Sequence, residues 1–316
     1  MTDLKFGFFL PHVPSPGLET LALKADVAGF DFICCDDHLM SPFSSMAPDF
    51  EGCYEAWTTM AYLAGKTKSV KLSHMVLVPT FRGPAVLARM ASTLDVLSGG
   101  RLILTTGAGW FQKEFEAYHI PWEGHKERIG REREALQIIR ALWTEDVVTF
   151  HGKYYSLTEA DSFPRPLQKP CPPIWVGGDS KQSMNVAAEL GDGWLMHGHY
   201  PEEVDRMIAR MRPLLGQKAD DFVFGTALFA LMGPTREKAD EKLRKVIPEK
   251  TWNDFMNADI RKEIKHRISG PPQDFVGRLR QYQAAGVNRI ILIFLDPADV
   301  DLFVKEVLPE FRNTGG

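Results

Sequence analysis

The segment 70–110, VKLSHMVLVPTFRGPAVLARMASTLDVLSGGRLILTTGAGW, constrains the fold of this chain more than any other stretch. It contains an apolar run, an amphipathic stretch that opens on Pro84, and a second apolar run. This order predicts a βαβ unit, because two parallel strands need a long crossover connection. Turn-forming residues follow both predicted strands, at 79–84 and at 107–110. Ligands bind beyond the carboxyl ends of strands in parallel α/β folds, so both turns are candidate sites.

The same alternation of short apolar runs and helical patterns continues along the chain. The predicted strands are Phe6–Leu10, Phe30–Cys35, Leu72–Val78, Leu102–Thr106, Ile174–Val176, Gly193–Met196, Val223–Leu231 and Arg289–Phe294. The predicted helices are Leu18–Ala28, Tyr54–Ala64, Pro84–Leu97, Ile129–Leu142, Ser183–Leu190, Glu202–Leu215 and Ala298–Phe311. Eight strands alternating with helices predict a (β/α)8 TIM barrel. We therefore expect a single α/β domain over residues 1–316.

Four segments do not fit an ideal barrel and are predicted to be insertions on its C-terminal face, where lids form. They are 41–53, 111–126, 144–172 and 233–271. The alternation within 147–157 predicts a small hairpin outside the barrel, and 233–271 has the composition of a long charged helical insertion.

Composition excludes several classes of protein. The net charge of −4, with acids and bases interspersed, argues against nucleic-acid binding. No apolar run approaches the roughly 18 residues of a membrane span, and we expect no secretory leader. The four cysteines include no C-x-x-C pair, so we expect free thiols, no metal site and a cytoplasmic location.

Asp36-Asp37-His38 follows the second predicted strand directly. A carboxylate beside an imidazole at a strand end suits proton transfer, with His38 as acid or base and Asp37 orienting it. The structural alternative is that Asp37 caps the next turn and His38 is a solvated loop residue. Arg82 also has two interpretations, because it can neutralise a phosphate or carboxylate or form a salt bridge between loop ends.

Two glycine pairs end predicted strands. Gly107 and Gly109 would let a flat ring approach the backbone, or would simply permit a tight turn. The segment Gly177-Gly178-Asp179-Ser180 precedes a predicted helix, so its backbone N–H groups suit a phosphate. The alternative is that Asp179 or Ser180 only caps that helix.

The remaining candidates are ring side chains. His12 and His197 follow predicted strands and are expected to face the barrel mouth. His74 lies within a strand, where a core or subunit-contact histidine is expected. Trp110 begins an aromatic stripe at helical spacing, which favours packing over a substrate pocket. No role is assigned to His119, His125, His151, His199 and His266.

Several strings together resemble one known family. They are FGFFLP at 6–11, DDHL at 36–39, PTFR at 79–82, ASTLDVLSGGR at 91–101, GAGW at 107–110, FHGKYY at 150–155, PIWVGG at 173–178 and GDGW at 191–194. The segment 128–143 also matches this family. On these motifs the chain resembles the bacterial-luciferase-like superfamily of flavin and deazaflavin oxidoreductases. The resemblance is specific from residue 5 to about residue 200 and looser beyond.

The resemblance implies a homodimeric TIM barrel that binds coenzyme F-420 (a deazaflavin) or FMN at its mouth. It implies that Gly177-Gly178-Asp179-Ser180 holds the cofactor phosphate, with Gly107 and Gly109 near the ring. It also implies a non-proline cis peptide near Met75-Val76, behind the ring, and the Asp37-His38 pair in front of it. We further assign Arg82 to cofactor binding, and His12, Trp110 and His197 to the substrate pocket.

The string Pro-Thr-Phe-Arg resembles deazaflavin-dependent sugar-phosphate and alcohol dehydrogenases, but those carry a glutamate where this chain has Trp110. The leading hypothesis is hydride transfer between coenzyme F-420 and a small organic substrate. One alternative is an FMN-dependent monooxygenase supplied with reduced flavin by a partner reductase. The other is a non-catalytic flavin-binding barrel.

Overall fold

Eight parallel strands form a nearly closed barrel, which confirms the predicted (β/α)8 architecture. The computed structural model describes residues 3–42, 52–161, 163–246 and 268–312. The strand order is β3-β2-β1-β11-β9-β8-β7-β4, and parallel bridges Leu72–Leu102 and Leu77–Thr106 link the two ends of this path. The barrel strands are β1 (Lys5–Phe9), β2 (Phe32–Cys35), β3 (Lys71–His74), β4 (Leu104–Thr106), β7 (Ile174–Gly177), β8 (Gly193–Met196), β9 (Val223–Met232) and β11 (Arg289–Phe294).

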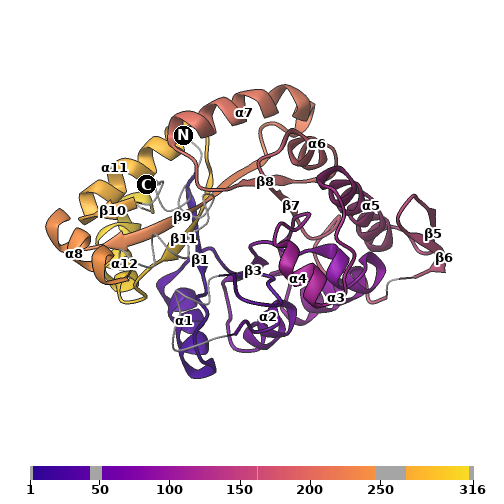
Figure 1. Ribbon diagram of the computed structural model, residues 1–316, viewed down its shortest axis with the longest axis horizontal. Coiled ribbons are helices and arrows are strands. Elements are labelled where there is room, and N and C mark those ends of the chain that lie inside the picture. The colour runs from indigo at the N-terminus through magenta and orange to yellow at the C-terminus, as the bar shows by residue number, and fades with distance from the viewer. Residues whose placement is uncertain (1–2, 43–51, 162, 247–267, 313–316) are drawn as a thin grey trace.

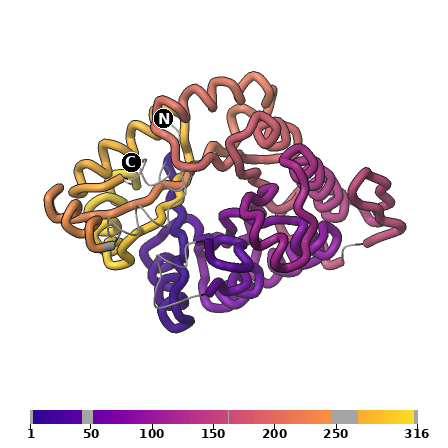
Figure 2. The backbone as a smooth tube through the Cα atoms, viewed as in Figure 1, coloured from indigo at the N-terminus to yellow at the C-terminus, as the bar shows by residue number. Residues whose placement is uncertain are grey.

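Helices surround the strands as an outer layer (Figure 1). They are α1 (Ser15–Ala28), α2 (Ala56–Ala64), α3 (Pro84–Leu97), α5 (His125–Thr144), α6 (Lys181–Leu190), α7 (Pro201–Leu215), α11 (Pro272–Ala284) and α12 (Asp299–Glu306). The indigo and yellow ends of the chain lie side by side in Figure 2, because β1 pairs with β11 in parallel. Among the helices of the described ranges, none has the combined length and hydropathy of a bilayer-spanning segment.

The core has two layers, since alternate side chains of each strand face opposite ways. On β8, Trp194 packs outward among the helices, while its neighbour Leu195 points into the barrel. Inside the barrel, Phe32 and Trp175 meet edge to face, with ring centroids 5.4 Å apart. A Cβ at Gly193 would lie 2.6 Å from the Trp175 ring, so the small residue makes room for the large one.

The third strand is shorter than the predicted Leu72–Val78, because the regular strand stops at His74. The Met75–Val76 peptide bond is cis, at the position that the family resemblance implies. Pairing with the fourth strand resumes at Leu77, whose N–H donates to the Thr105 carbonyl. Residues 74–76 therefore form a bulge in the barrel wall.

The insertions differ in detail from the prediction. The hairpin is present as β5 (Val148–His151) and β6 (Ser156–Ala160), and it projects from the side of the barrel (Figure 1). The segment after β4 contains a short helix, α4 (Gln112–Ala117). The charged insertion includes α8 (Arg236–Val246) and ends in a strand, β10 (Ile268–Gly270), that pairs with β9. The predicted insertions at 41–53 and 233–271 otherwise lie largely outside the described residues.

Helix α11 was absent from the prediction, although its signal is present in the sequence. Phe275, Leu279 and Tyr282 recur at helical spacing and are all buried on its inner face. Pro272 occupies the first turn, where a missing N–H costs nothing.

Candidate active site

The carboxyl ends of β2 and β4 bring His38 against a buried carboxylate. The Nδ1 atom of His38 lies 3.1 Å from both carboxylate oxygens of Glu114, which is 1% exposed and lies on α4. The Leu39 N–H also donates to Glu114, at 3.0 Å. A carboxylate here accepts the Nδ1–H hydrogen bond, which makes Nε2 the nitrogen that can exchange a proton.

Two aromatic side chains border this imidazole. The Trp110 ring meets His38 edge to face, with centroids 5.6 Å apart, and Phe111 does so at 6.0 Å. Trp110 is 49% exposed, so the sequence-based preference for packing does not describe it fully. It stands beside the candidate acid/base with half of its surface open to solvent.

Asp37 does not contact His38 in the way that the sequence suggested. Its carboxylate forms a bidentate pair with Arg82, at 2.6 and 2.8 Å, and accepts the Val78 N–H at 2.9 Å. Its side chain is 2% exposed, and Arg82 also pairs with Glu55. The orienting carboxylate of His38 is therefore Glu114, and the salt-bridge interpretation of Arg82 is the one that the structure shows.

The Asp37–Arg82 pair links the end of β2 to the start of α2 and to the segment that follows β3. Burial alone would lower the pKa of Arg82, but Asp37 and Glu55 outweigh it and hold that pKa above its usual range. Glu55 caps α2 by accepting the N–H groups of Trp57 and Thr58. Arg82 thus links three segments of the chain, and its guanidinium is paired with the carboxylates of Asp37 and Glu55.

His12 lies at the mouth, as expected, and is held by a carboxylate of its own. Its Nε2 atom is 2.8 Å from Asp36 Oδ1. Burial alone would lower the pKa of His12, but hydrogen bonds and charge from Asp36 and Cys53 raise it to about 10. His12 is consequently an imidazolium at neutral pH.

The Met75–Val76 bulge explains two of the glycines. A Cβ at Gly107 would lie 2.5 Å from Val76 Cγ2, and a Cβ at Gly177 would lie 2.9 Å from Val76 Cγ1. Both glycines therefore make room for the Val76 side chain. Met75 and Val76 are partly exposed and pack on the apolar barrel interior, so the bulge presents an apolar wall at the mouth.

Gly109 serves the same region differently. Its φ of +80° suits glycine, and a Cβ there would lie 2.6 Å from the Phe115 ring. Phe115 directly follows Glu114 in α4, so Gly109 lets α4 pack closely enough for Glu114 to reach His38.

Next to β4 in the barrel, the turn between β7 and α6 positions a second charged group. Ser180 caps α6 by accepting the Ser183 N–H at 3.0 Å, and Gly178 has a φ of +119°. Asp179 lies 3.0 Å from His199 and 3.5 Å from His197. Burial would raise the pKa of Asp179, but both histidines outweigh it and hold that pKa well below its usual range.

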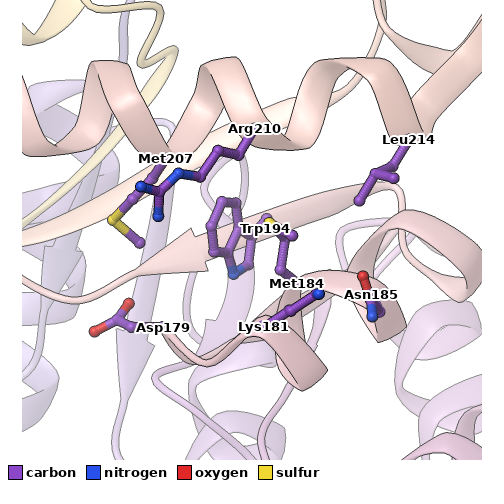
Figure 3. Close-up of a pocket in the computed structure, with 8 residues that line it drawn as sticks. All are labelled: Asp179, Lys181, Met184, Asn185, Trp194, Met207, Arg210 and Leu214. Atoms are coloured by element: carbon purple, nitrogen blue, oxygen red, sulfur yellow. The ribbon is translucent and has the colours of Figure 1, made fainter.

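A pocket of about 430 Å³ extends from this turn between α6 and α7. Figure 3 shows Arg210 and Met207 of α7 facing Lys181 and Met184 of α6 across Trp194. The indole N–H of Trp194 donates to the Gly178 carbonyl at 2.7 Å, which joins the floor of the pocket to the turn. Two cations thus line an apolar groove beside the predicted phosphate turn.

Sequence reasoning missed Glu114, Lys181, Arg210 and His199. Glu114 was detectable as the acid within an aromatic helical stripe, and Lys181 as a cation directly after the capping Ser180. Arg210 had no local signal, because it enters the site from a separate helix.

The fold agrees with comparisons to known proteins. The profile of the family described as luciferase-like monooxygenase matches residues 5–292. The chain is 25% identical to the FMNH(2)-dependent dimethylsulfone monooxygenase of Pseudomonas putida, covering 98% of this chain and 96% of the relative. It is 29% identical to the F420-dependent glucose-6-phosphate dehydrogenase of Amycolatopsis mediterranei, covering 94% and 95%.

A solved F420-dependent secondary alcohol dehydrogenase, in complex with an F420-acetone adduct, superposes with a TM-score of 0.82. The two sequences are 22% identical, and the match covers 99% of this chain and 100% of the other. At this identity the likeness supports the barrel fold alone.

Proposed function

This chain belongs to the luciferase-like monooxygenase family, whose members are oxidoreductases and monooxygenases, and we propose that it transfers a hydride between coenzyme F-420 and a small organic substrate. The observation that carries this proposal is the His38–Glu114 pair at the barrel mouth. Hydride transfer to or from a carbon that bears oxygen also moves a proton, so it needs an acid/base within reach.

The residues at the mouth fit the ring of such a cofactor. Met75 and Val76 form a partly exposed apolar wall, and the cofactor ring is flat and largely apolar on its faces. His38 follows β2 and Trp110 follows β4, the two strands on either side of β3 and its bulge, and the two rings meet edge to face. A substrate between ring and imidazole would be within reach of both.

The turn between β7 and α6, which lies beside this wall, fits an anionic group. The Gly178–Ser180 turn opens helix α6, whose first N–H groups and dipole favour negative charge. Lys181 and Arg210 line the adjoining pocket and add two positive charges. Asp179 is compensated by His197 and His199, so its charge opposes the anion less than an isolated carboxylate would.

When bound, coenzyme F-420 supplies a ring carbon that accepts or donates a hydride. His38 exchanges the accompanying proton at Nε2 with the substrate oxygen. Glu114 accepts the Nδ1–H hydrogen bond, keeps the ring oriented and stabilises its protonated form. Trp110 and Phe111 shield this imidazole from water on two sides.

The second candidate is an FMN-dependent monooxygenase. It is favoured by the match to the dimethylsulfone monooxygenase, which extends over 98% of this chain. The apolar wall and the anion-binding pocket suit FMN as well, so the two candidates differ in what His38 must do. A proton acceptor fixed by a buried carboxylate is central to alcohol–ketone chemistry and is less demanded by oxygen insertion.

Turnover assays separate the candidates. Purified protein is mixed with oxidised coenzyme F-420 and small alcohols or aldehydes, or with the reduced coenzyme and small aldehydes or ketones. The visible absorbance of the oxidised cofactor is followed, as a loss in the first series and a gain in the second. Parallel assays supply FMN, a flavin reductase and oxygen, and measure product formation. We expect absorbance change with at least one substrate only in the F-420 series. Product only in the FMN series contradicts the proposal, and no turnover in either favours a non-catalytic barrel.

A further inference from the structure

A second cluster of reactive groups lies at the mouth, next to the His38 site but not part of it. Three chain segments contribute Cys53, His12 and Asp36. The Sγ atom of Cys53 lies 3.9 Å from Nδ1 of His12, and Nε2 of His12 lies 2.8 Å from Asp36 Oδ1. The side chains of His12 and Asp36 are 14% and 9% exposed, so the arrangement is held inside the protein.

The order of these groups has a chemical consequence. The Asp36 carboxylate accepts the Nε2–H of His12, so the second ring N–H points at the sulfur of Cys53. The titratable neighbours that raise the pKa of His12 are Asp36 and Cys53. Glu55, two residues after Cys53, is engaged by Arg82 and by the N–H groups of Trp57 and Thr58. A thiol beside a positively charged imidazole loses its proton more readily.

The other three cysteines provide an internal contrast. Cys34, Cys35 and Cys171 are buried, whereas Cys53 is partly exposed. Burial raises the pKa of all three buried thiols. The Cys34 and Cys35 thiols also lie near the carbonyls of Phe8 and Ala56, to which they can donate. None of the three has a histidine partner in the described structure.

We propose that Cys53, His12 and Asp36 form a nucleophilic site at the barrel mouth that captures soft carbon electrophiles. With an α-halo amide, the sulfur attacks the carbon, a C–S bond forms, the carbon–halogen bond breaks and halide leaves. With an α,β-unsaturated carbonyl compound, the sulfur adds to the β-carbon and the π electrons move to the α-carbon. That carbon then takes a proton from Nδ1 of His12. Asp36 is a positioning residue, and the site is independent of which cofactor the barrel binds.

Alkylation at two pH values tests this site on the wild-type protein. The native protein is exposed briefly to iodoacetamide at pH 8 and at pH 6, and each cysteine peptide is quantified by mass spectrometry. We expect Cys53 to react at least about tenfold faster than the buried thiols, and its rate to fall less than about threefold at pH 6. An ordinary thiol, with a pKa near 8.5, would slow by about 75-fold over the same interval.

Variants test whether His12 and Asp36 cause the weak pH dependence of Cys53 alkylation. His12→Gln and Asp36→Asn are expected to restore the steep pH dependence at Cys53, whereas the matched control Cys171→Ser leaves its rates unchanged. The wild-type profile decides the matter even where a variant fails to fold. A Cys53 rate that falls by about 75-fold at pH 6, or that matches the rates of the buried thiols, overturns the proposal.

Discussion

Both sides of the barrel mouth carry charged side chains, but they differ in whether those charges are paired within the protein or line a pocket. On the β1–β4 side, Arg82 forms ion pairs with Asp37 and Glu55 within the protein, and Glu114 holds His38. On the β7–β8 side, Lys181 and Arg210 line an open pocket. Committed charges position groups, whereas charges that face a pocket are available to a ligand. The first side should therefore govern stability and turnover, and the second should govern cofactor affinity.

The largest effect is expected from breaking the Asp37–Arg82 pair. Arg82→Met leaves the Asp37 carboxylate buried and unpaired, which should lower the free energy of unfolding by about 3–5 kcal/mol. Urea unfolding measures this change. Adding Asp37→Asn keeps an acceptor for the Val78 N–H and should recover most of the loss. An unchanged unfolding midpoint in Arg82→Met would show that the pair does not hold the β1–β4 side together.

Next in size is the effect of His38 on turnover. His38→Asn should reduce kcat about 100-fold or more, because it removes the acid/base while leaving the cofactor surfaces intact. Glu114→Gln should give a smaller reduction, since the ring stays in place but its protonated form loses a charge partner. Steady-state kinetics test both, with cofactor affinity as the control. Equal losses in kcat and in affinity would place His38 in binding instead.

The two sides should also differ in how they make the free energy of unfolding depend on pH. Burial, the larger cause, and the charge of Arg82 lower the pKa of His74 to about 3. Because that pKa lies below the unfolded value of about 6.5, His74 contributes stability above pH 6.5 that is lost as the pH falls. Between pH 7.5 and pH 5 the loss should be about 2 kcal/mol. Asp179 should contribute no such change, since its lowered pKa matters only below the unfolded value of about 3.9.

The variant His74→Phe isolates this contribution and keeps a ring stacked on Trp57, which lies 5.4 Å away. Its free energy of unfolding should fall about 2 kcal/mol less than that of the wild type between these pH values. Parallel pH profiles for the two proteins would mean that buried His74 does not titrate as described.

The smallest expected effects lie on the β7–β8 side. Lys181→Met and Arg210→Met should each weaken cofactor binding about tenfold, because each removes one charge-assisted contact to the anionic end. Both should leave kcat nearly unchanged at saturating cofactor. Lys305→Met, a change at an exposed surface ion pair, is the matched control and should bind normally. Loss of kcat without loss of affinity would reverse the division between the two sides.

Local sequence patterns were sufficient for the barrel, and the family resemblance located the Met75–Val76 bulge. Strand-forming runs and glycine turns are short-range signals, and they placed most elements within a few residues of where they lie. The charge partners were not predictable in this way. His38 and Glu114 are 76 residues apart, and Asp37 and Arg82 are 45 apart, so their pairing depends on how β2, β3 and α4 pack. Because Asp37 and His38 are adjacent in the sequence, we expected their side chains to interact. In the structure Asp37 pairs with Arg82, and His38 pairs with Glu114.

The role of two glycines was also only partly predictable from the sequence. The sequence predicts a flat ring near Gly107 and a phosphate at the turn that begins with Gly177, and in the structure both glycines accommodate the Val76 side chain. Sequence shows that a small residue is needed, but only the fold shows what fills the space.

The most direct test of the proposed function is a calorimetric titration of the purified protein with coenzyme F-420 and, separately, with FMN. We predict saturable F-420 binding that is at least about tenfold tighter than FMN binding, and that weakens in Lys181→Met but not in His38→Asn. Tight FMN binding with no heat from F-420 would contradict the assignment of a deazaflavin hydride-transfer enzyme.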